Sequence, residues 1–212
     1  MTIALVQGSP EWLAIRCGKV TASRVADVVA KTKTGYGSSR ANYAAELIAE
    51  RLTGQPAVAF TNMALQRGTE LEPEARSAYG LHANCDVVEV GFVPHPTISD
   101  SGASPDGLVG DEGLVECKCP NTANHLETLL GGSIKNNYLL QCQWQLACTG
   151  RKWVDFCSYD PRLGGSMCLF VKRLYRDDAV ISELEREVIK FLVEIDAKIN
   201  DLIKRYGAKV AA

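Results

Sequence analysis

Apolar residues recur at intervals of three and four positions in several segments of the chain, which is the spacing of one buried helix face. The longest such segment runs from Asp177 to about Lys204. Near the N-terminus, Ser9 and Pro10 are residue types that favour a helix cap and a first helical turn, so a helix is predicted to begin there. The other predicted helices span residues 20–32, 40–54, 63–80, 125–132 and 136–150, and Pro73 is expected to interrupt the one over 63–80.

The hydrophobic pattern changes after residue 84, where shorter apolar runs lie between turn residues. Strands are predicted over residues 85–95, 113–119, 153–160 and 166–175. The Gly, Ser and Lys residues of 31–39 are typical of a loop. Because helices and strands follow one another without a linker or a repeat, a single α/β or α+β domain over residues 1–212 is predicted.

The composition agrees with a globular chain. Of its 212 residues, 46% are hydrophobic and 23% are charged, which is enough apolar material for a buried core. No run of about eighteen apolar residues is present, so no transmembrane helix or membrane association is expected. The N-terminus lacks the basic and apolar regions of a signal peptide, so the protein is predicted to be cytoplasmic.

Cysteine is frequent, with eight residues, but the spacing does not favour a metal centre. There is no C-x-x-C pair, and the close pair Cys117 and Cys119 would lie on one face of a strand. The three histidines are far apart in the sequence. We therefore expect buried, reduced thiols, and neither zinc nor an iron–sulfur cluster.

The net charge of −2 does not by itself indicate a nucleic-acid-binding protein. The charge is uneven, however, because residues 1–40 contain six basic and two acidic side chains, which leaves the remainder at −6. A local basic surface can steer a polyanion, although most such clusters are solvated faces.

Three charged residues suggest a catalytic site. Glu116 and Lys118 are two positions apart in the predicted strand 113–119, so they share one face, while Val115 and Cys117 face the other way. Asp106 lies in the preceding turn and reaches the same place if the strands pair. Carboxylates suit Mg²⁺, and a lysine can orient a water molecule or stabilise transition-state charge. An ordinary exposed strand edge is the alternative explanation.

Weaker candidates lie on the predicted helices. Glu72 is one of three closely spaced glutamates, which a solvated acidic face would also explain. Gln141 is followed one turn later by Gln145, a pair that suits a phosphate or a base but also an ordinary polar face. Arg16 precedes the segment GKVTAS, whose lysine and hydroxyl groups surround a predicted helix start and could hold a phosphate.

Taken together, these segments resemble the lambda-exonuclease-like, or YqaJ-type, viral recombinase nucleases of the PD-(D/E)xK superfamily. The acidic pattern here is P-D-x(9)-E-x-K. The resemblance covers nearly the whole chain and rests on EWLAIRCGKVTAS, ERLTG, ALQRGTELEPEAR, SPDGL, GLVECKCP, LGG, YLLQCQW and YDPR, in the family order. Residues 31–39 match poorly, and the segment after Arg176 matches only in pattern.

The resemblance implies an α/β fold with a restriction-endonuclease-like core, in which helices flank a central mixed β-sheet. It also implies an Mg²⁺-dependent enzyme, with Mn²⁺ as a substitute. Such an enzyme degrades one strand of linear double-stranded DNA in the 5′→3′ direction, preferably from 5′-phosphorylated ends. The 3′ overhangs would serve phage-type recombination by strand annealing. The expected partners are DNA ends, two further copies in a toroidal homotrimer and a single-strand annealing protein, in a bacterial host cell.

The resemblance also assigns roles to residues. The metal ligands fall on Asp106, Glu116 and the backbone carbonyl of Cys117, with Glu72 holding a second metal or its water. Lys118 corresponds to the catalytic lysine. The pocket for the 5′-terminal phosphate is expected to comprise Arg16, Ser23, Ser104 and Gln141. The alternatives are an endonuclease of the restriction or repair type in the same superfamily and a catalytically inactive module that binds DNA ends.

Overall fold

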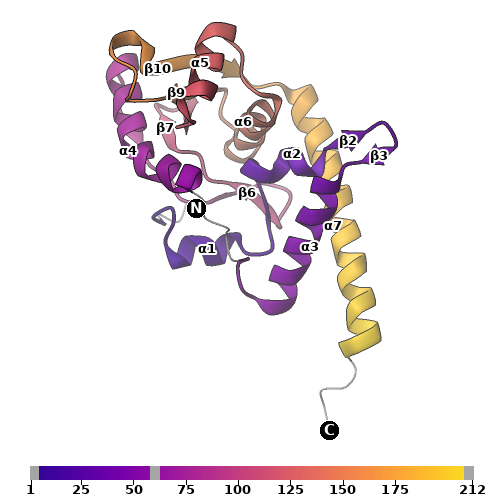
Figure 1. Ribbon diagram of the computed structural model, residues 1–212. Coiled ribbons are helices and arrows are strands. Elements are labelled where there is room, and N and C mark those ends of the chain that lie inside the picture. The colour runs from indigo at the N-terminus through magenta and orange to yellow at the C-terminus, as the bar shows by residue number, and fades with distance from the viewer. Residues whose placement is uncertain (1–4, 58–62, 208–212) are drawn as a thin grey trace.

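A five-stranded mixed sheet forms the centre of the computed structural model, which describes residues 5–57 and 63–207 (Figure 1). The strand order is β10-β9-β8-β7-β4. Strands β8 and β9 are parallel, and every other neighbouring pair in this sheet is antiparallel. The strands are β4 (Val87–Val88), β7 (Gly107–Val109), β8 (Gly113–Lys118), β9 (Trp153–Tyr159) and β10 (Leu169–Tyr175).

Helices cover both faces of this sheet, and the alternation along β8 decides which side chains meet which helix. Val115 and Cys117 belong to the apolar cluster that contains Ala75 of α4 (Met63–Ala83). Leu114 belongs to the cluster on the other face, with Cys142 of α6 (Asn136–Thr149). The predicted division of the strand into two faces is therefore confirmed, as is the predicted arrangement of a central mixed sheet flanked by helices.

Helix α4 differs from its prediction, because it continues through Pro73 and past Gly80. A proline inside a helix costs roughly 3 kcal/mol. Burial of Ala75 and Tyr79, both 0% exposed against the sheet, offsets that local cost. The helix ends instead before Asn84, whose positive φ of 49° suits a residue that follows a helix C-terminus.

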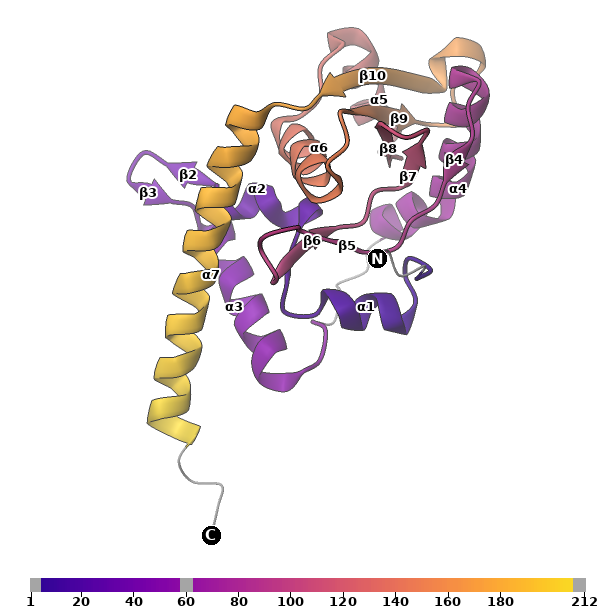
Figure 2. The same ribbon diagram turned by 180° about the vertical axis from the view of Figure 1, so that it is seen from behind.

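A second group of elements packs on the outer side of α6. A three-stranded sheet of order β1-β6-β5 lies among these elements, and Tyr43, Trp144 and Phe191 are buried in their common core. In Figures 1 and 2 the long helix α7 runs beside α3 and extends past it. The bounds are α1 (Pro10–Arg16), β1 (Val20–Thr21), η1 (Ala22–Arg24), α2 (Val25–Val28), α3 (Ser38–Thr53), β5 (Val93–Pro94), β6 (Ser101–Ala103) and α7 (Asp178–Tyr206).

The helix predicted within residues 20–32, with Thr21 or Ser23 as its cap, is shorter than expected. Val20 and Thr21 form β1, which pairs in parallel with β6, and the helical part is divided into the short η1 and α2 and ends at Val28. Val20 is fully buried, and its carbonyl accepts a hydrogen bond from the Ser101 hydroxyl at 2.9 Å. Pairing with a distant strand thus overrides the local helical pattern.

The segment 31–39, predicted as a loop, contains a small hairpin of β2 (Lys31–Thr32) and β3 (Gly35–Tyr36). The Tyr36 hydroxyl donates to Glu187 of α7 at 2.6 Å, which attaches the hairpin to that helix. The remaining elements are α5 (Thr122–Gly131) and η2 (Gly165–Met167).

Most of the other helix predictions are confirmed. Helix α3 ends at Gly54, and α6 ends at Gly150, both with positive φ. Helix α7 begins after Asp177, whose side chain accepts hydrogen bonds from two backbone amides of the first turn. Of the helices within residues 5–57 and 63–207, none combines the length and the hydropathy that a membrane span requires. The assignment of residues 1–212 to one nuclease domain stays a prediction.

Candidate active site

The predicted catalytic residues meet at one edge of the central sheet, where β7 begins and β8 ends. Because Gly107 pairs with Val115, the preceding Asp106 lies beside Glu116 and Cys117. The backbone amide of Cys117 donates a hydrogen bond to Asp106 Oδ2 at 2.7 Å. A Cβ atom at position 107 would lie 2.2 Å from the Val87 side chain, so glycine permits this close strand packing. The strand pairing on which the sequence hypothesis depended is present.

Glu116 is the most enclosed of these acids, with 1% of its surface exposed. Its Oε1 atom accepts hydrogen bonds from Gln141 Nε2 and lies 2.5 Å from Lys118 Nζ. Its Oε2 atom accepts from Gln145 Nε2, also at 2.5 Å. Two amides from successive turns of α6 therefore fix the carboxylate without adding charge.

Lys118 keeps a strongly favoured positive charge in this site. Burial by itself lowers the pKa of the ammonium group, but the negative charges of Glu116 and Asp106 raise it further, so the net pKa is above its ordinary value. The ammonium also lies 5.3 Å from the centre of the Tyr138 ring. Lys118 is therefore a fixed cation and a hydrogen-bond donor at the sheet edge.

The environment of Asp106 disfavours the charged form of its side chain, whereas that of Lys118 favours it. Burial raises the pKa of its carboxyl group well above the ordinary value, and the charges of Glu116 and Glu72 raise it more, whereas Lys118 and the Cys117 amide lower it. The Asp106 side of the site thus contains more negative charge than the local cations neutralise.

Glu72 approaches the site from α4. Its carboxylate pairs with Arg76 one turn later, at 2.6 Å, and the same guanidinium pairs with Glu89 at 3.0 Å. Burial raises the pKa of Glu72, Arg76 lowers it and Glu116 raises it, with a net upward shift. The mutual influence of Glu72, Asp106 and Glu116 supports their predicted grouping.

The donor atoms of this site are of the chemical type that binds a divalent metal. Within residues 5–57 and 67–207, the cations that act on the carboxylates of Glu72, Asp106 and Glu116 are Lys118 and Arg76, and hard oxygen ligands are those that Mg²⁺ prefers. The buried Oε1 atom of Gln145 has no hydrogen-bond partner among the described residues. In that part of the chain, no three His, Cys, Asp or Glu side chains already converge as a complete ligand set. The two amides and the lysine are the groups that contact the Glu116 oxygens in this arrangement.

Part of the predicted phosphate pocket lies next to this edge. Arg16 Nη1 and Trp12 Nε1 both donate to the Ser104 hydroxyl at 3.0 Å, and Ser104 is two residues before Asp106. The Arg16 guanidinium lies 3.9 Å from the centre of the Trp12 ring. Burial lowers the pKa of Arg16 to about 10, which leaves it charged at neutral pH, and the cost of that burial favours an anionic partner.

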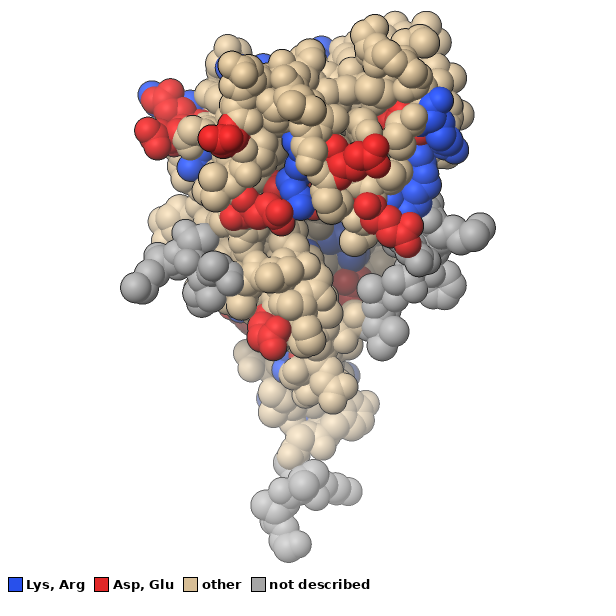
Figure 3. Space-filling model, turned by 90° about the vertical axis from the view of Figure 1, so that its left-hand side faces the viewer, with Lys and Arg blue, Asp and Glu red and all other residues tan. Residues whose placement is uncertain are grey.

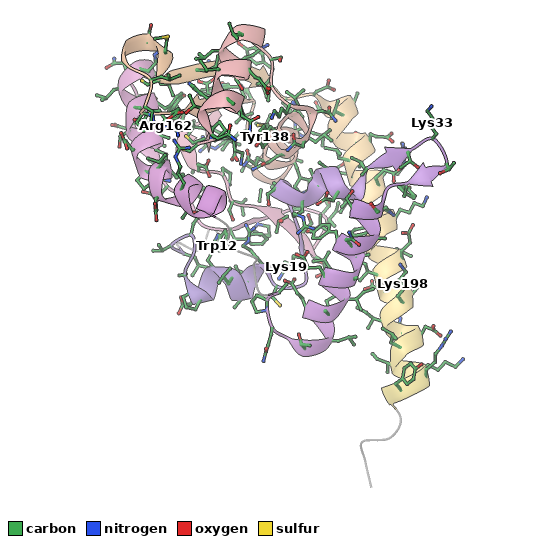
Figure 4. All side chains as sticks on the ribbon, in the orientation of Figure 1. Trp12, Lys19, Lys33, Tyr138, Arg162 and Lys198 are labelled. Atoms are coloured by element: carbon green, nitrogen blue, oxygen red, sulfur yellow. The ribbon has the colours of Figure 1, made fainter. Side chains whose placement is uncertain are left out.

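Arg16 also lines a cavity of about 460 Å³ together with Ser23 and Lys19. Trp12 and Lys19 are labelled in Figure 4, on the side of the molecule that carries α1. Gln141, by contrast, directs its amide to Glu116. The structure therefore groups Arg16 with Ser104 and Ser23 and places Gln141 with the carboxylates. A role for Gln141 at the 5′ phosphate stays a prediction.

Two positioning residues were absent from the predicted site. Gln145 holds Glu116, and its spacing of four from Gln141 on the same helix was the available signal. Arg76 holds Glu72, and the Glu-to-Arg spacing of four would have suggested that pair. The Glu72–Arg76 pair within α4 and the shared helix face of Gln141 and Gln145 follow from helix periodicity. The contacts of the two glutamines with Glu116 of β8 do not.

The surface over this region is not uniformly basic. Seen from the side of α4, acidic and basic side chains both lie around a hollow at the level between α4 and α1 (Figure 3). Several basic residues of the N-terminal 40 also have acidic partners: Arg24 pairs with Asp27 and Glu46, and Arg40 with Glu194. The sequence-level charge of this segment therefore overstates the free positive charge.

Comparison with known proteins identifies the family. A family model described as the YqaJ-like viral recombinase domain matches residues 11–152, which is more than half of the chain. This chain belongs to the YqaJ-like viral recombinase family. The predicted resemblance is therefore confirmed. None of the curated proteins compared with the chain matches it.

Solved structures agree with this family. The alkaline exonuclease LHK-Exo from Laribacter hongkongensis is 55% identical over 96% of this chain and 100% of its own, with a TM-score of 0.88. LHK-Exo in complex with dAMP is 54% identical with the same coverage and a TM-score of 0.89. A phage-related exonuclease from Haemophilus somnus 129PT is 15% identical over 87% of this chain and 96% of its own, with a TM-score of 0.66, which is evidence of fold alone.

The predicted restriction-endonuclease-like core is confirmed by these exonuclease folds. Membership of the YqaJ-like family and the similarity to an alkaline exonuclease support a nuclease role for this chain.

Proposed function

We propose that this protein is an Mg²⁺-dependent 5′→3′ exonuclease that degrades one strand of linear double-stranded DNA and leaves 3′ single-stranded overhangs. The observation that carries the proposal is the meeting of Asp106, Glu116 and Lys118 at one sheet edge, next to the Arg16–Ser104 pair. The similarity to an alkaline exonuclease at 55% identity supports the same reaction class.

The metal would be held by oxygen atoms of four residues. These are the carboxylates of Asp106 and Glu116, the backbone carbonyl of Cys117 and, for a second metal or its water, the carboxylate of Glu72. Mg²⁺, or Mn²⁺ in its place, would neutralise phosphate charge and lower the pKa of a bound water molecule. Neither zinc nor an iron–sulfur cluster is part of the proposal.

The chain's own residues supply orientation and charge. The Lys118 ammonium donates hydrogen bonds that orient the attacking water and stabilise negative charge on the phosphate oxygens. Gln141 and Gln145 keep the Glu116 carboxylate in one position, which preserves the geometry of the site. Because these donors are preorganised, they need not reorganise during the reaction.

The end of the DNA is selected by a separate group of residues. A 5′-terminal phosphate would bind Arg16, Ser104 and Ser23, and its position would place the next phosphodiester at Asp106 and Lys118. The guanidinium is already fixed by Ser104 and Trp12, so little side-chain entropy is lost on binding. The Gln141 amide contacts Glu116, and a further contact of Gln141 with the 5′ phosphate is part of the proposal because the sequence resemblance implies it.

The proposed reaction also suggests partners. We infer that the enzyme acts in the cytoplasm of a bacterial host on behalf of a phage or prophage. The 3′ overhangs would be passed to a single-strand annealing protein, and a toroidal homotrimer would retain the DNA during degradation.

Digestion of a linear duplex in Mg²⁺ tests the function. One end carries a 5′ phosphate and the other a 5′ hydroxyl, and a closed circular duplex is the control. The expected result is loss of one strand from the phosphorylated end, with the circle intact. Cleavage of the circle would instead support an endonuclease of the same superfamily. No cleavage in Mg²⁺ or Mn²⁺ would support an inactive module that binds DNA ends.

Arg16→Ala should reduce the preference for phosphorylated ends. Loss of a charge-assisted contact to the phosphate should slow degradation from that end about tenfold, with little effect on hydroxyl ends. The measurement is the ratio of the two initial rates for the variant and the wild type. An equal loss of rate on both ends would contradict the proposed role of Arg16.

A further inference from the structure

A second charged cluster lies at the same sheet edge as the candidate active site, just after β9. Asp160 is 0% exposed, and its Oδ1 atom accepts from Arg67 Nη2 at 3.0 Å and from Arg162 Nε at 2.9 Å. Its Oδ2 atom accepts from Arg162 Nη2 at 2.8 Å and from the Thr122 hydroxyl at 2.6 Å. One buried carboxylate thus fixes two arginine side chains from different elements.

The cluster is adjacent to the proposed catalytic residues. Strands β8 and β9 are parallel, and Lys118 pairs with Ser158, so Asp160 extends beyond the same edge as Lys118. Arg67 Nη1 also donates to the carbonyl of Pro120, two residues past Lys118, at 2.7 Å. Neighbouring strands lie roughly 4.8 Å apart, so the two groups are close neighbours along the edge.

Arg162 retains capacity to bind another group. Its side chain is 54% exposed, and its hydrogen bonds within the described part of the chain use the backbone N–H, Nε and Nη2, not Nη1. Two guanidinium groups share one carboxylate, so the cluster has an excess positive charge beside an edge that is otherwise rich in carboxylates. Figure 4 shows Arg162 next to α4, the helix that supplies Arg67.

We propose that Arg162, positioned by Asp160, binds the DNA backbone phosphate that follows the cleaved bond in the same strand. An arginine held in a fixed plane is suited to a phosphate because its N–H groups are already oriented. Arg67 completes the cluster by joining α4 to the end of β8. This inference rests on the proposed exonuclease function, since it requires a DNA strand at Lys118.

The order of these groups along the edge of the sheet gives the direction in which the bound DNA strand would run. The Arg16–Ser104 pair precedes β7, Asp106 begins β7, Lys118 ends β8 and Arg162 follows β9. A strand whose 5′ end binds at Arg16 would pass Lys118 with its reacting phosphodiester. Its next phosphate would then lie on the β9 side, within reach of Arg162.

The test is the affinity for a 5′-phosphorylated linear duplex in EDTA, which prevents cleavage, measured by fluorescence anisotropy over a range of NaCl concentrations. Arg162→Ala should bind about tenfold more weakly, and the slope of log K against log salt should fall by about 1. Arg205→Ala is the matched control, because Arg205 is an exposed arginine paired with Asp201 on α7. It should leave affinity and slope unchanged.

A modified duplex identifies the phosphate itself. Replacing the phosphate that follows the cleaved bond with a neutral methylphosphonate should weaken binding by the wild type as much as Arg162→Ala does. The same replacement should have little further effect on Arg162→Ala, because the two changes remove one contact. An unchanged slope for Arg162→Ala, or an equal methylphosphonate effect in variant and wild type, would overturn the inference.

The wild-type protein alone keeps the inference testable if Arg162→Ala does not fold. If the methylphosphonate does not change the affinity of the wild type for the duplex, the inference is overturned without any variant. Failure of the proposed function is distinct, because it would appear as a wild-type protein that leaves unmodified linear DNA intact in Mg²⁺. If the protein cleaves linear DNA but its affinity is unchanged by the methylphosphonate, the Arg162 contact is rejected and the proposed function is not.

Discussion

Asp106 and Asp160 are two buried aspartates at the same edge of the central sheet, but their surroundings shift their pKa values in opposite directions. Hydrogen bonds from Arg162 lower the pKa of Asp160, despite the opposing effect of burial. Burial and the charges of Glu116 and Glu72 raise the pKa of Asp106. Asp160 is stabilised as an anion by the protein itself, whereas Asp106 lacks an equivalent partner.

The difference distinguishes a structural acid from one that is available for a ligand. Arginine neutralises Asp160 and holds it in place. Glu116, next to Asp106, is held by the neutral amides of Gln141 and Gln145 and by the cation of Lys118. Neutral donors fix a carboxylate without cancelling its charge, so the site keeps an excess of negative charge that a divalent cation would relieve.

The largest contrast is expected in the reaction rate. Asp106→Asn removes a proposed metal ligand and should slow degradation of linear DNA at least about a thousandfold. Asp160→Asn leaves all proposed ligands in place and weakens the contacts that hold Arg162, Arg67 and Thr122, so it should cost about tenfold. Initial rates in saturating Mg²⁺ measure both. Similar losses for the two variants would remove the functional distinction between these acids.

The two variants should also change stability in opposite directions in metal-free protein at about pH 8. Asp160→Asn breaks a buried ion pair and should lower Tm by on the order of 10 °C. Asp106→Asn removes an unfavourable buried charge and should raise Tm by a few degrees, about 2–4 °C for each kcal/mol gained. Thermal unfolding followed by circular dichroism in EDTA measures both shifts.

The pH dependence supplies the control for this pair. The lowered pKa of Asp160 stabilises the fold above its ordinary pKa, and that contribution is lost as pH falls toward the folded pKa. The raised pKa of Asp106 favours the fold at low pH, and that contribution is lost as pH rises through the folded pKa. The difference between Asp106→Asn and the wild type should therefore shrink as pH falls toward about 4, whereas the difference for Asp160→Asn should shrink only below about pH 4. A difference that does not change with pH would show that packing, not charge, is responsible.

The smallest effect is expected at Gln145, which tests whether neutral donors matter. Gln145→Leu leaves the Glu116 Oε2 atom without its amide donor and should lower the rate about tenfold. Gln143→Leu is the matched control on the same helix, since Gln143 bonds to Tyr175 and Asp177 backbone groups instead of Glu116. Single-turnover rates on linear duplex measure both variants. An equal effect at the two positions would indicate a general loss of helix packing.

Sequence reasoning succeeded where the responsible interaction is local. Glu116 and Lys118 share a face of β8 because side chains alternate along any strand, and this follows from their spacing of two. The ends of α3 and α6 at Gly54 and Gly150 follow from the ability of glycine to adopt positive φ. These features need no knowledge of distant residues.

Sequence reasoning failed where distant contacts decide the outcome. Helix α4 continues through Pro73 because its next turns are buried against the sheet. Val20 and Thr21 form a strand because they pair with β6, about 80 positions away in the sequence. In both cases the packing energy of the folded state exceeds a local preference of a few kcal/mol at most.

The sequence by itself determined the family, the acid–acid–lysine pattern of Asp106, Glu116 and Lys118, and the faces on which those residues lie, because strand periodicity and motif spacing are local properties. Only the tertiary structure decided which groups surround each acid. Gln145 reaches Glu116 and Arg67 reaches Asp160 across separate elements, over 29 and 93 positions of sequence. The charge state of a buried carboxylate depends on such through-space neighbours, and no local pattern specifies them.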